Sequence, residues 1–335
     1  MGRTDRIEVP TLSGLAPVVE SWLSTRTSHA RDWPVGKLLA AKGNTTVSVV
    51  LPARNEADTV GSIVAMVRES LIERYPLVDE LVVVDSGSTD STAGVAAAAG
   101  ARVVRQDEVL AHLPQLSGKG DALWKGLAAT SGDVVAFIDA DLVGCPPEFV
   151  TGLLGPLLAD PNLVYVKGFY RRPLVRPGYT EANGGGRVTE LVARPLLNLY
   201  WPALAGFIQP LAGEYAGRRA ALEAVPFAAC YGVEVGLLID LLELVGLDGL
   251  AQVDLGHRRH RHQSNDALAR MSTQIMLTLF ARLGRCGGCA LPQTAATLTQ
   301  FRDSGSGDTP TREVLVTEMD VSERPPLATL VSATR

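Results

Sequence analysis

The sequence is poor in cysteine and has no excess of basic residues, and both shortages exclude classes of protein. Only 4 of its 335 residues are cysteine, so we expect no disulfide framework of the kind that stabilises secreted domains. Acidic residues outnumber basic ones by 36 to 31, for a net charge of −5, which argues against a general nucleic-acid-binding protein. The N-terminal residues, with Arg3, Asp5, Arg6 and Glu8, lack the apolar core of a signal peptide. We therefore expect a cytoplasmic protein that binds no nucleic acid.

Long apolar runs are also scarce, and the strongest candidate for a membrane span is the uncharged stretch at residues 195–213. It is nearly long enough to cross a bilayer. However, three prolines together with Asn198 and Gln209 interrupt it, and Arg194 and Glu214 bound it. We expect helices packed inside a globular domain and no stable membrane insertion; a membrane-facing helix pair is the alternative.

Several well-known catalytic motifs are absent. The sequence has no Gly-x-Ser-x-Gly turn of a serine hydrolase, no P-loop, and no Gly-x-Gly-x-x-Gly after its first predicted strand. Cys286 and Cys289 form a lone Cys-x-x-Cys pair, and without a second pair or neighbouring histidines we expect no zinc site there.

What the sequence does contain is a regular alternation of strands and helices. A hydrophobic content of 46% and a charged content of 20% indicate a globular protein. The alternation predicts an α/β fold with a doubly wound, mostly parallel sheet. The expected strands lie at residues 47–51, 80–84, 101–104 and 134–138, and the expected helices at 57–71, 91–99 and 121–129.

The second half of the sequence is less regular and more helical. We expect helices at 147–158, from 188 onward, at 233–245 and at 267–283, with strands at 163–166 and 251–255. The chain then divides into an N-terminal arm or short helices at 1–45, an α/β half at 46–168, a helical half at 169–290 and a surface tail at 291–335.

Two acidic residues, Asp139 and Asp141, directly follow the apolar run at residues 134–138. Open α/β sheets bind ligands at the carboxyl edge of such buried strands. Carboxylate oxygens suit Mg²⁺ or Mn²⁺, which commonly bridge protein carboxylates to phosphate oxygens. Because Asp-x-Asp pairs are also frequent in turns, it is the position after a strand that favours a divalent-cation site.

Residues 51–56 (LPARNE) and 84–90 (VDSGSTD) follow the first and second predicted strands. The carboxyl end of the first strand is a nucleotide position in such sheets, and Asp85 is placed to accept a hydrogen bond from a base or a ribose. The alternative is that Asn55, Ser88 and Asp90 only cap the helices that follow.

Two basic motifs complete the set. In residues 118–120 (GKG), glycines allow close backbone approach and Lys119 can neutralise a diphosphate, although a solvated loop lysine is equally compatible. Residues 258–262 (RRHRH) are usually read as a solvated charge run. In an acidic protein, however, this cluster favours contact with phosphate or with a metal, and His260 is a candidate metal ligand.

Together, the motifs at 51–56, 84–90, 118–120 and 139–141 resemble the nucleotide-sugar half of GT-A glycosyltransferases in order and spacing. Motifs at 186–191 (GRVTEL), 210–219 (PLAGEYAGRR) and 231–234 (YGVE) narrow the resemblance to the glucosyl-3-phosphoglycerate synthases of actinobacteria, retaining enzymes of glycosyltransferase family 81. The resemblance implies a GT-A fold with a Rossmann-like sheet, in which 46–168 binds the nucleotide sugar and 169–290 the acceptor.

The resemblance also implies an activity and a set of site residues. The activity is transfer of glucose from UDP-glucose to the 2-hydroxyl of 3-phosphoglycerate with retention, in the pathway of methylglucose lipopolysaccharide, by a homodimer that uses Mg²⁺ or Mn²⁺. The uridine would contact Pro52, Ala53, Glu56 and Ser86; the diphosphate and sugar would contact Lys119, Asp139, Tyr231, Glu234, Arg258 and His262; the acceptor would contact Gly186, Arg187, Thr189 and Arg171; and the metal would bind Asp141 and His260.

For catalysis, we expect Lys119 and Arg258 to stabilise the UDP leaving group together with the cation. Asp139 would face the ribose or the sugar, and a backbone carbonyl near Leu211 would steady the developing cation. Glu234 is the candidate nucleophile, but front-side attack is favoured. The alternatives are an inverting polyprenyl-phosphate sugar transferase, which shares the first-half motifs, and a non-catalytic nucleotide-sugar-binding protein.

Overall fold

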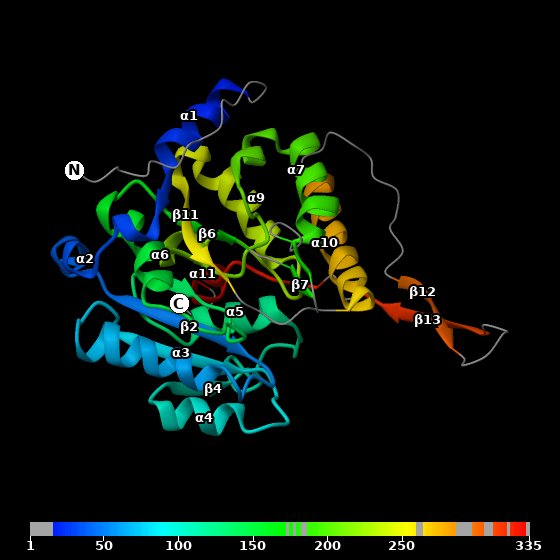
Figure 1. The fold of residues 1–335 in the computed structure, drawn as a ribbon, viewed down its shortest axis with the longest axis horizontal. Helices are drawn as coiled ribbons and strands as arrows, with labels where there is room; N and C mark the ends of the chain where they lie inside the picture. Colours follow the sequence, from blue (N-terminus) through cyan, green and yellow to red (C-terminus); the bar gives the residue numbers. More distant parts are fainter. Residues whose placement is uncertain are drawn as a thin grey trace.

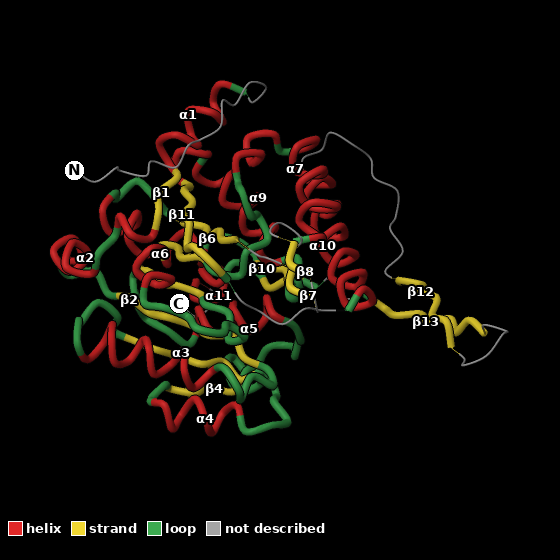
Figure 2. Tube along the Cα trace, viewed as in Figure 1, coloured by secondary structure: helices red, strands yellow, loops and turns green. Residues whose placement is uncertain are grey.

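The computed structural model describes residues 16–171, 174–176, 179–181, 186–258, 264–285, 297–304, 311–319 and 322–332. Within these ranges an eight-stranded sheet forms the centre of the molecule, with helices on both of its faces (Figures 1 and 2). The Cys286–Cys289 pair, His260 and His262 lie outside the described residues.

The eight strands run in the order β1-β11-β6-β9-β5-β2-β3-β4. Strand β9 pairs antiparallel with both β5 and β6, whereas the other neighbours pair in parallel. The expected mostly parallel α/β sheet is therefore confirmed, and the antiparallel strand is an addition to it. The strands are β1 (Thr27–His29), β2 (Val47–Ala53), β3 (Glu80–Asp85), β4 (Arg102–Arg105), β5 (Val134–Phe137), β6 (Tyr165–Arg171), β9 (Tyr215–Arg218) and β11 (Leu250–His257).

Alternating side chains of the central strands supply two separate cores. Along β2, Val49 and Leu51 enter one core and Val50 enters the other, because successive residues of a strand point to opposite faces. The first core is covered by α2 (Val35–Lys42), α3 (Val60–Val67), α4 (Thr92–Ala99) and α6 (Glu148–Ala159); the second is covered by α5 (Lys119–Ala128), α7 (Arg194–Tyr200), α8 (Arg219–Glu223), α9 (Val233–Val245) and α10 (Asn265–Arg285).

Irregular helices replace two of the predicted α-helices in part. The helix predicted at 57–71 is split into α3 and the π-helical η2 (Arg68–Glu73). The helix predicted from 188 begins as the π-helical η3 (Thr189–Ala193), continues as α7 and ends in the 3₁₀ helix η4 (Pro202–Gly206). None of the helices in the described ranges is both long enough and apolar enough to cross a membrane. Within residues 195–213, α7 and η4 are helical, as predicted, whereas residues 207–213 form no helix.

The N-terminal segment is part of the folded body. Helix α1 (Pro17–Arg26) buries Val19 and Trp22, the Trp22 indole donates to the Leu250 carbonyl at 2.9 Å, and β1 joins the sheet beside β11. The short helices η1 (Ala30–Asp32) and η5 (Leu247–Gly249) lie at the ends of β1 and β11.

The C-terminal segment differs from the expected surface tail. Strands β12 (Thr297–Ser304) and β13 (Thr311–Glu318) form a hairpin that projects from the body (Figure 1). The chain then returns as β14 (Glu323–Arg324), which pairs with β10 (Phe227–Ala228), and ends in α11 (Leu327–Ser332). Arg324 and Leu327 are buried. A separate small hairpin is formed by β7 (Leu174–Arg176) and β8 (Tyr179–Glu181).

Candidate active site

A cavity of about 610 Å³ opens at the carboxyl ends of β2, β3 and β5. Residues from both halves of the chain line it, which the topology explains because β9 and α9 carry second-half residues to the same edge. The predicted site residues that line this cavity are Pro52, Ala53, Glu56, Ser86, Lys119, Asp139, Asp141, Gly186, Arg187, Thr189, Leu211, Tyr231, Glu234 and Arg258.

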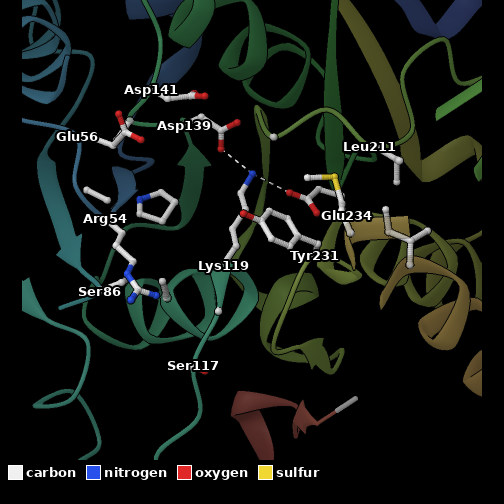
Figure 3. A pocket seen from close by; sticks show the side chains of 18 of the residues that line it. Arg54, Glu56, Ser86, Ser117, Lys119, Asp139, Asp141, Leu211, Tyr231 and Glu234 are labelled. Atoms are coloured by element: carbon white, nitrogen blue, oxygen red, sulfur yellow. Dashed lines mark ion pairs between the residues drawn. The ribbon is translucent and has the colours of Figure 1, made fainter. Parts of the chain in front are cut away.

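Lys119 is the cationic centre of the cavity. Its Nζ lies 2.6 Å from Asp139 Oδ1 and 2.8 Å from Glu234 Oε1 (Figure 3). Burial by itself lowers the pKa of Lys119, but the two carboxylates hold that pKa well above its ordinary value. The ammonium therefore stays charged, and it links the end of β5 to the first turn of α9.

Arg258 gathers the acidic residues from the opposite side. Its Nη2 lies 2.9 Å from Asp139 Oδ2 and 2.8 Å from Asp141 Oδ1, and its Nη1 donates to the Tyr170 hydroxyl at 2.6 Å and to Glu214 Oε2 at 3.3 Å. Burial raises the pKa of Asp139, yet Lys119 and Arg258 outweigh that effect and hold it well below its usual range. Asp139 is therefore an anion at neutral pH.

The close packing of this network depends on one glycine. A Cβ built on Gly213 would lie 2.2 Å from Asp139 Oδ2, a distance that no side chain can occupy. Gly213 belongs to the loop that leads into β9, so the antiparallel strand can enter the sheet beside Asp139 without displacing it. This close approach explains why the first glycine of the motif at 210–219 is needed at position 213.

The charge of the network suits a divalent cation. Its four carboxylates, Asp139, Asp141, Glu214 and Glu234, face two cations, Lys119 and Arg258, which leaves a formal charge of −2. Hard carboxylate oxygens and substrate phosphates are the ligands that Mg²⁺ and Mn²⁺ prefer. Within the described ranges no three His, Cys, Asp or Glu side chains are grouped as a metal site. The residues therefore fit a cation that takes few protein ligands and is completed by a diphosphate.

The motifs at 51–56 and 84–90 hold each other in place. Asn55, which adopts a positive φ of 57°, accepts a hydrogen bond from the Thr89 amide at 2.8 Å, and the Ser88 hydroxyl accepts from the Asn55 amide at 3.0 Å. Asp85 accepts from the Ser88 amide at 3.3 Å and is not among the residues that line the cavity. In this structure the carboxylate orders the loop that carries Ser86, and its expected contact with a base or ribose stays a prediction.

Arg171 is the predicted acceptor residue that does not line the main cavity. It lines a second cavity of about 500 Å³, to which Gly186 and Thr189 also contribute. Arg187 lines the main cavity and donates to Asn265 Oδ1 at 2.7 Å. This bond attaches the segment that carries Arg187 to the first turn of α10.

Some lining residues were not predicted from the sequence. One polar residue follows β2, the other polar ones lie between β4 and α5, and the apolar ones belong to α10. The polar residues are Arg54, Gln106, Asp107, Gln115 and Ser117, and the apolar ones are Leu268, Met271 and Ile275. The end of the third predicted strand was a usable signal for Gln106 and Asp107, whereas nothing local marks the face of α10 that meets the cavity.

Lys167 of β6 lies buried beneath the site. It is 1% exposed, its Nζ donates to the Tyr165 hydroxyl at 3.3 Å, and it lies 4.6 Å from the centre of the Tyr215 ring. Burial lowers the pKa of Lys167 to about 7. A lysine in the unfolded chain has a pKa of about 10.4. At pH values between the folded-state pKa and the unfolded-state pKa, the unfolded state therefore binds more protons than the folded state.

This difference predicts how Lys167→Met changes stability with pH. The cost of burying the amine is full below pH 7 and declines as the pH rises toward 10, so wild-type stability gains over that range. We therefore compare the free energies of unfolding of the two proteins. The value for Lys167→Met minus the value for the wild type should decrease by about 3 kcal/mol between pH 7 and pH 9.5. Urea unfolding of both proteins at the two pH values measures it; a difference that does not change with pH would contradict the assignment.

Comparison with known proteins agrees with this site. Residues 48–220 match the model of glycosyl transferase family 2. A glucosyl-3-phosphoglycerate synthase of Mycolicibacterium smegmatis is 50% identical over 309 residues, which cover 92% of this chain and 98% of that protein.

Three solved structures, of two enzymes, are similar over nearly their whole length. A glucosyl-3-phosphoglycerate synthase from Mycobacterium tuberculosis, in complex with Mn²⁺, UDP and phosphoglyceric acid, superimposes with a TM-score of 0.79 at 45% identity, covering 91% of this chain and 98% of that one. Another structure of that enzyme contains Mg²⁺ and UDP. A mannosyl-3-phosphoglycerate synthase from Rubrobacter xylanophilus gives a TM-score of 0.84 at 40% identity, covering 94% and 99% of the two chains. The chain thus belongs to the glucosyl-3-phosphoglycerate synthases, within the GT-A glycosyl transferases of family 2.

Proposed function

We propose that this chain transfers glucose from UDP-glucose to the 2-hydroxyl of 3-phosphoglycerate, with retention of the anomeric configuration, in the cytoplasm. The observation that carries the proposal is the charged centre Asp139–Lys119–Glu234, which joins the two halves of one cavity at the carboxyl edge of the sheet. Family membership supports the substrates, since related enzymes bind UDP-glucose and phosphoglyceric acid.

The two halves of the chain divide the substrates between them. Residues 46–168 provide the donor side, where Pro52, Ala53, Glu56 and Ser86 line the part of the cavity formed by β2 and β3. Backbone groups at such strand ends are suited to read the edge of a base. Residues 169–290 provide the acceptor side.

The carboxylates at the end of β5 suit the diphosphate region. Asp141 and His260 would hold Mg²⁺ or Mn²⁺, and Asp139, which shares Arg258 with Asp141, would face the ribose or the sugar. When bound, such a cation supplies positive charge to the UDP leaving group. Lys119 adds a fixed positive charge within the same cavity, and Arg258 pairs with both aspartates and orients them.

The surroundings of Glu234 bear on which of the two routes to retention operates. An enzyme nucleophile needs a free carboxylate facing the anomeric carbon, but Glu234 is 4% exposed and paired with Lys119 at 2.8 Å. A paired carboxylate is better suited to bind sugar hydroxyls. We therefore favour front-side attack, in which the acceptor hydroxyl enters on the face that the diphosphate leaves and Leu211, which lines the cavity, provides a backbone carbonyl.

Arg187 is the proposed anchor of the acceptor's anionic groups. A hydrogen bond between charged partners is worth about 1.5–3 kcal/mol, so Arg187→Met should raise the KM for 3-phosphoglycerate by roughly ten- to a hundredfold. The KM for UDP-glucose should change by less than about twofold, because this residue lies on the other side of the cavity. Steady-state kinetics with each substrate varied in turn measures both values.

A matched control is Arg74→Met, which removes an exposed arginine at the opposite edge of the sheet. It should leave both KM values unchanged. An Arg187→Met enzyme with unaltered KM for 3-phosphoglycerate would refute the acceptor role.

The homodimer is a further part of the proposal. The β12–β13 hairpin exposes Phe301, Val314 and Val316 on one face, at 66%, 55% and 65%, and Phe301 pairs directly with Val314. An exposed apolar strand face is typical of an association surface. Light scattering should give twice the chain mass for the wild type and the single-chain mass for Phe301→Ser with Val316→Ser.

The proposed function is tested by a UDP-release assay with UDP-glucose, 3-phosphoglycerate and Mg²⁺. Release should require the acceptor and should not occur with polyprenyl phosphate. Because a mannosyl-3-phosphoglycerate synthase is also structurally similar, GDP-mannose is the second donor to test. Turnover with GDP-mannose but not with UDP-glucose would replace glucose by mannose in the proposal.

A further inference from the structure

Residues 322–332, near the end of the chain, pack against the base of the proposed active site. Strand β14 pairs with β10, with Phe227 opposite Arg324, and the Ala229 amide donates to the Ser322 carbonyl at 2.9 Å. Further along, the Trp124 indole donates to the Pro325 carbonyl at 3.0 Å. The segment is therefore attached to α5, whose first residue is Lys119, and to the strand beside it.

The start of α5 rests directly on the strand that β14 holds. A Cβ on Gly120 would lie 1.8 Å from the Ala228 carbonyl oxygen, and the Asp121 amide donates to the Ala229 carbonyl at 2.9 Å. Any shift of residues 228–229 therefore moves Lys119. Glycine at 120 serves this close approach as well as access to a ligand.

Arg324 adds a buried charge pair at the same point. Its Nε donates to Asp121 Oδ1 at 2.5 Å and its Nη2 to the Pro114 carbonyl at 2.9 Å, while Gln106 Nε2 donates to Asp121 Oδ2 at 2.5 Å. Asp121 is 0% exposed and Arg324 is 3% exposed. Because Gln106, Gln115 and Ser117 line the cavity, this pair fixes the polar loop on the donor side.

The neighbouring Glu323 reaches the acceptor side. It forms ion pairs with Arg282 and Arg285 of α10, and Arg282 Nη2 also lies 2.8 Å from Asp240 Oδ2 of α9. Helix α9 carries Glu234 in its first turn, and α10 carries the apolar wall of the cavity. One short segment is thus bonded to the helix that begins with Lys119 and, through Arg282 of α10, to the helix that carries Glu234.

We propose that residues 322–332 act as a clamp on the active site and that Arg324 is a positioning residue, which places the donor-side loop and Lys119 through Asp121 and Pro114. The role concerns how this site binds UDP-glucose and therefore rests on the proposed function. Arg324 does not touch the substrate. It acts by fixing the ends of segments 106–118 and 119–128, which together carry the polar donor-side lining and the central cation.

The test compares Arg324→Met, Arg324→Lys and the double variant Asp121→Asn with Arg324→Met, using Arg74→Met as a control that removes an exposed arginine. UDP binding is measured by calorimetry with Mg²⁺, at a temperature at which circular dichroism shows each variant to be folded. Hydrogen exchange of peptides covering 106–121 is compared with that of peptides covering β2.

Arg324→Met should weaken UDP binding by about tenfold or more, because small displacements of positioning groups have effects of this size. Arg324→Lys should lie between it and the wild type, since it keeps the charge but not the planar fork. Exchange should accelerate at 106–121 and not in β2. If Arg324→Met does not fold, the double variant, which removes both charges of the Arg324–Asp121 pair, should bind UDP as weakly.

Wild-type UDP affinity and wild-type exchange in a folded Arg324 variant would overturn the clamp. If the wild-type protein does not bind UDP, it is the proposed function that fails. Exchange at 106–121 then still decides whether Arg324 holds this loop.

Discussion

Asp139→Asn should lower kcat/KM for UDP-glucose by on the order of 10³-fold. The carboxylate is the junction of the network, since it pairs with Lys119 at 2.6 Å and with Arg258 at 2.9 Å. The amide removes one negative charge, so the formal charge falls from −2 to −1 and both cations lose an ionised partner. The apparent affinity for Mn²⁺ in the presence of UDP should fall at least about tenfold.

Two measurements check this expectation. Steady-state kinetics gives the loss in kcat/KM, and the resonance signal of free Mn²⁺, titrated into protein with UDP, gives the cation affinity without turnover. Asp248→Asn, which changes an exposed aspartate on η5, is the matched control and should alter neither value. An Asp139→Asn enzyme that retains a tenth or more of the wild-type kcat/KM would contradict the assignment.

Lys119→Met should lower kcat by about 10²–10³-fold, the usual effect of removing one preorganised charge that faces a developing anion. The substitution also leaves Asp139 and Glu234 close together without the ammonium between them. Like charges at short distance raise the pKa of one partner. The acidic limb of the pH–rate profile of the remaining activity should therefore shift to higher pH. A pH–rate profile from pH 5 to 9 measures both effects.

Lys37→Met is the control for this substitution, because Lys37 is exposed on α2, away from the cavity. It should leave kcat and the profile unchanged. If Lys119→Met kept its kcat and changed only stability, the ammonium would be a structural ion pair, as a lysine in a polar loop often is.

Much of the donor half could be predicted from the sequence because its signals are local. Each apolar strand ends at a polar motif, and parallel strands bring their carboxyl ends to one edge, so Pro52, Ser86 and Asp139 meet in the cavity. The strand-to-helix alternation, in contrast, predicts the sheet only in part. Nothing in the sequence near Tyr215 indicates that β9 enters the sheet antiparallel.

The remaining features depend on contacts between distant residues. Arg258 lines the cavity, as expected, but its second role could not be predicted: its bonds to Asp139, Asp141 and Glu214, more than forty residues away in each case, make it the organiser of the acidic network. The link from Arg324 to Asp121 spans 203 residues, and the polar composition after residue 301 suggested a surface tail instead. Such pairings leave no periodic pattern in either partner.

The most direct test of the central claim is proton NMR of the product formed from UDP-glucose and 3-phosphoglycerate with Mg²⁺. The proposed retaining transfer predicts one glucosyl product, joined to the 2-hydroxyl of 3-phosphoglycerate, whose anomeric proton shows the small coupling of an α-linkage. A β-linked product would contradict retention, and the absence of any glucosylated 3-phosphoglycerate would contradict the proposed function itself.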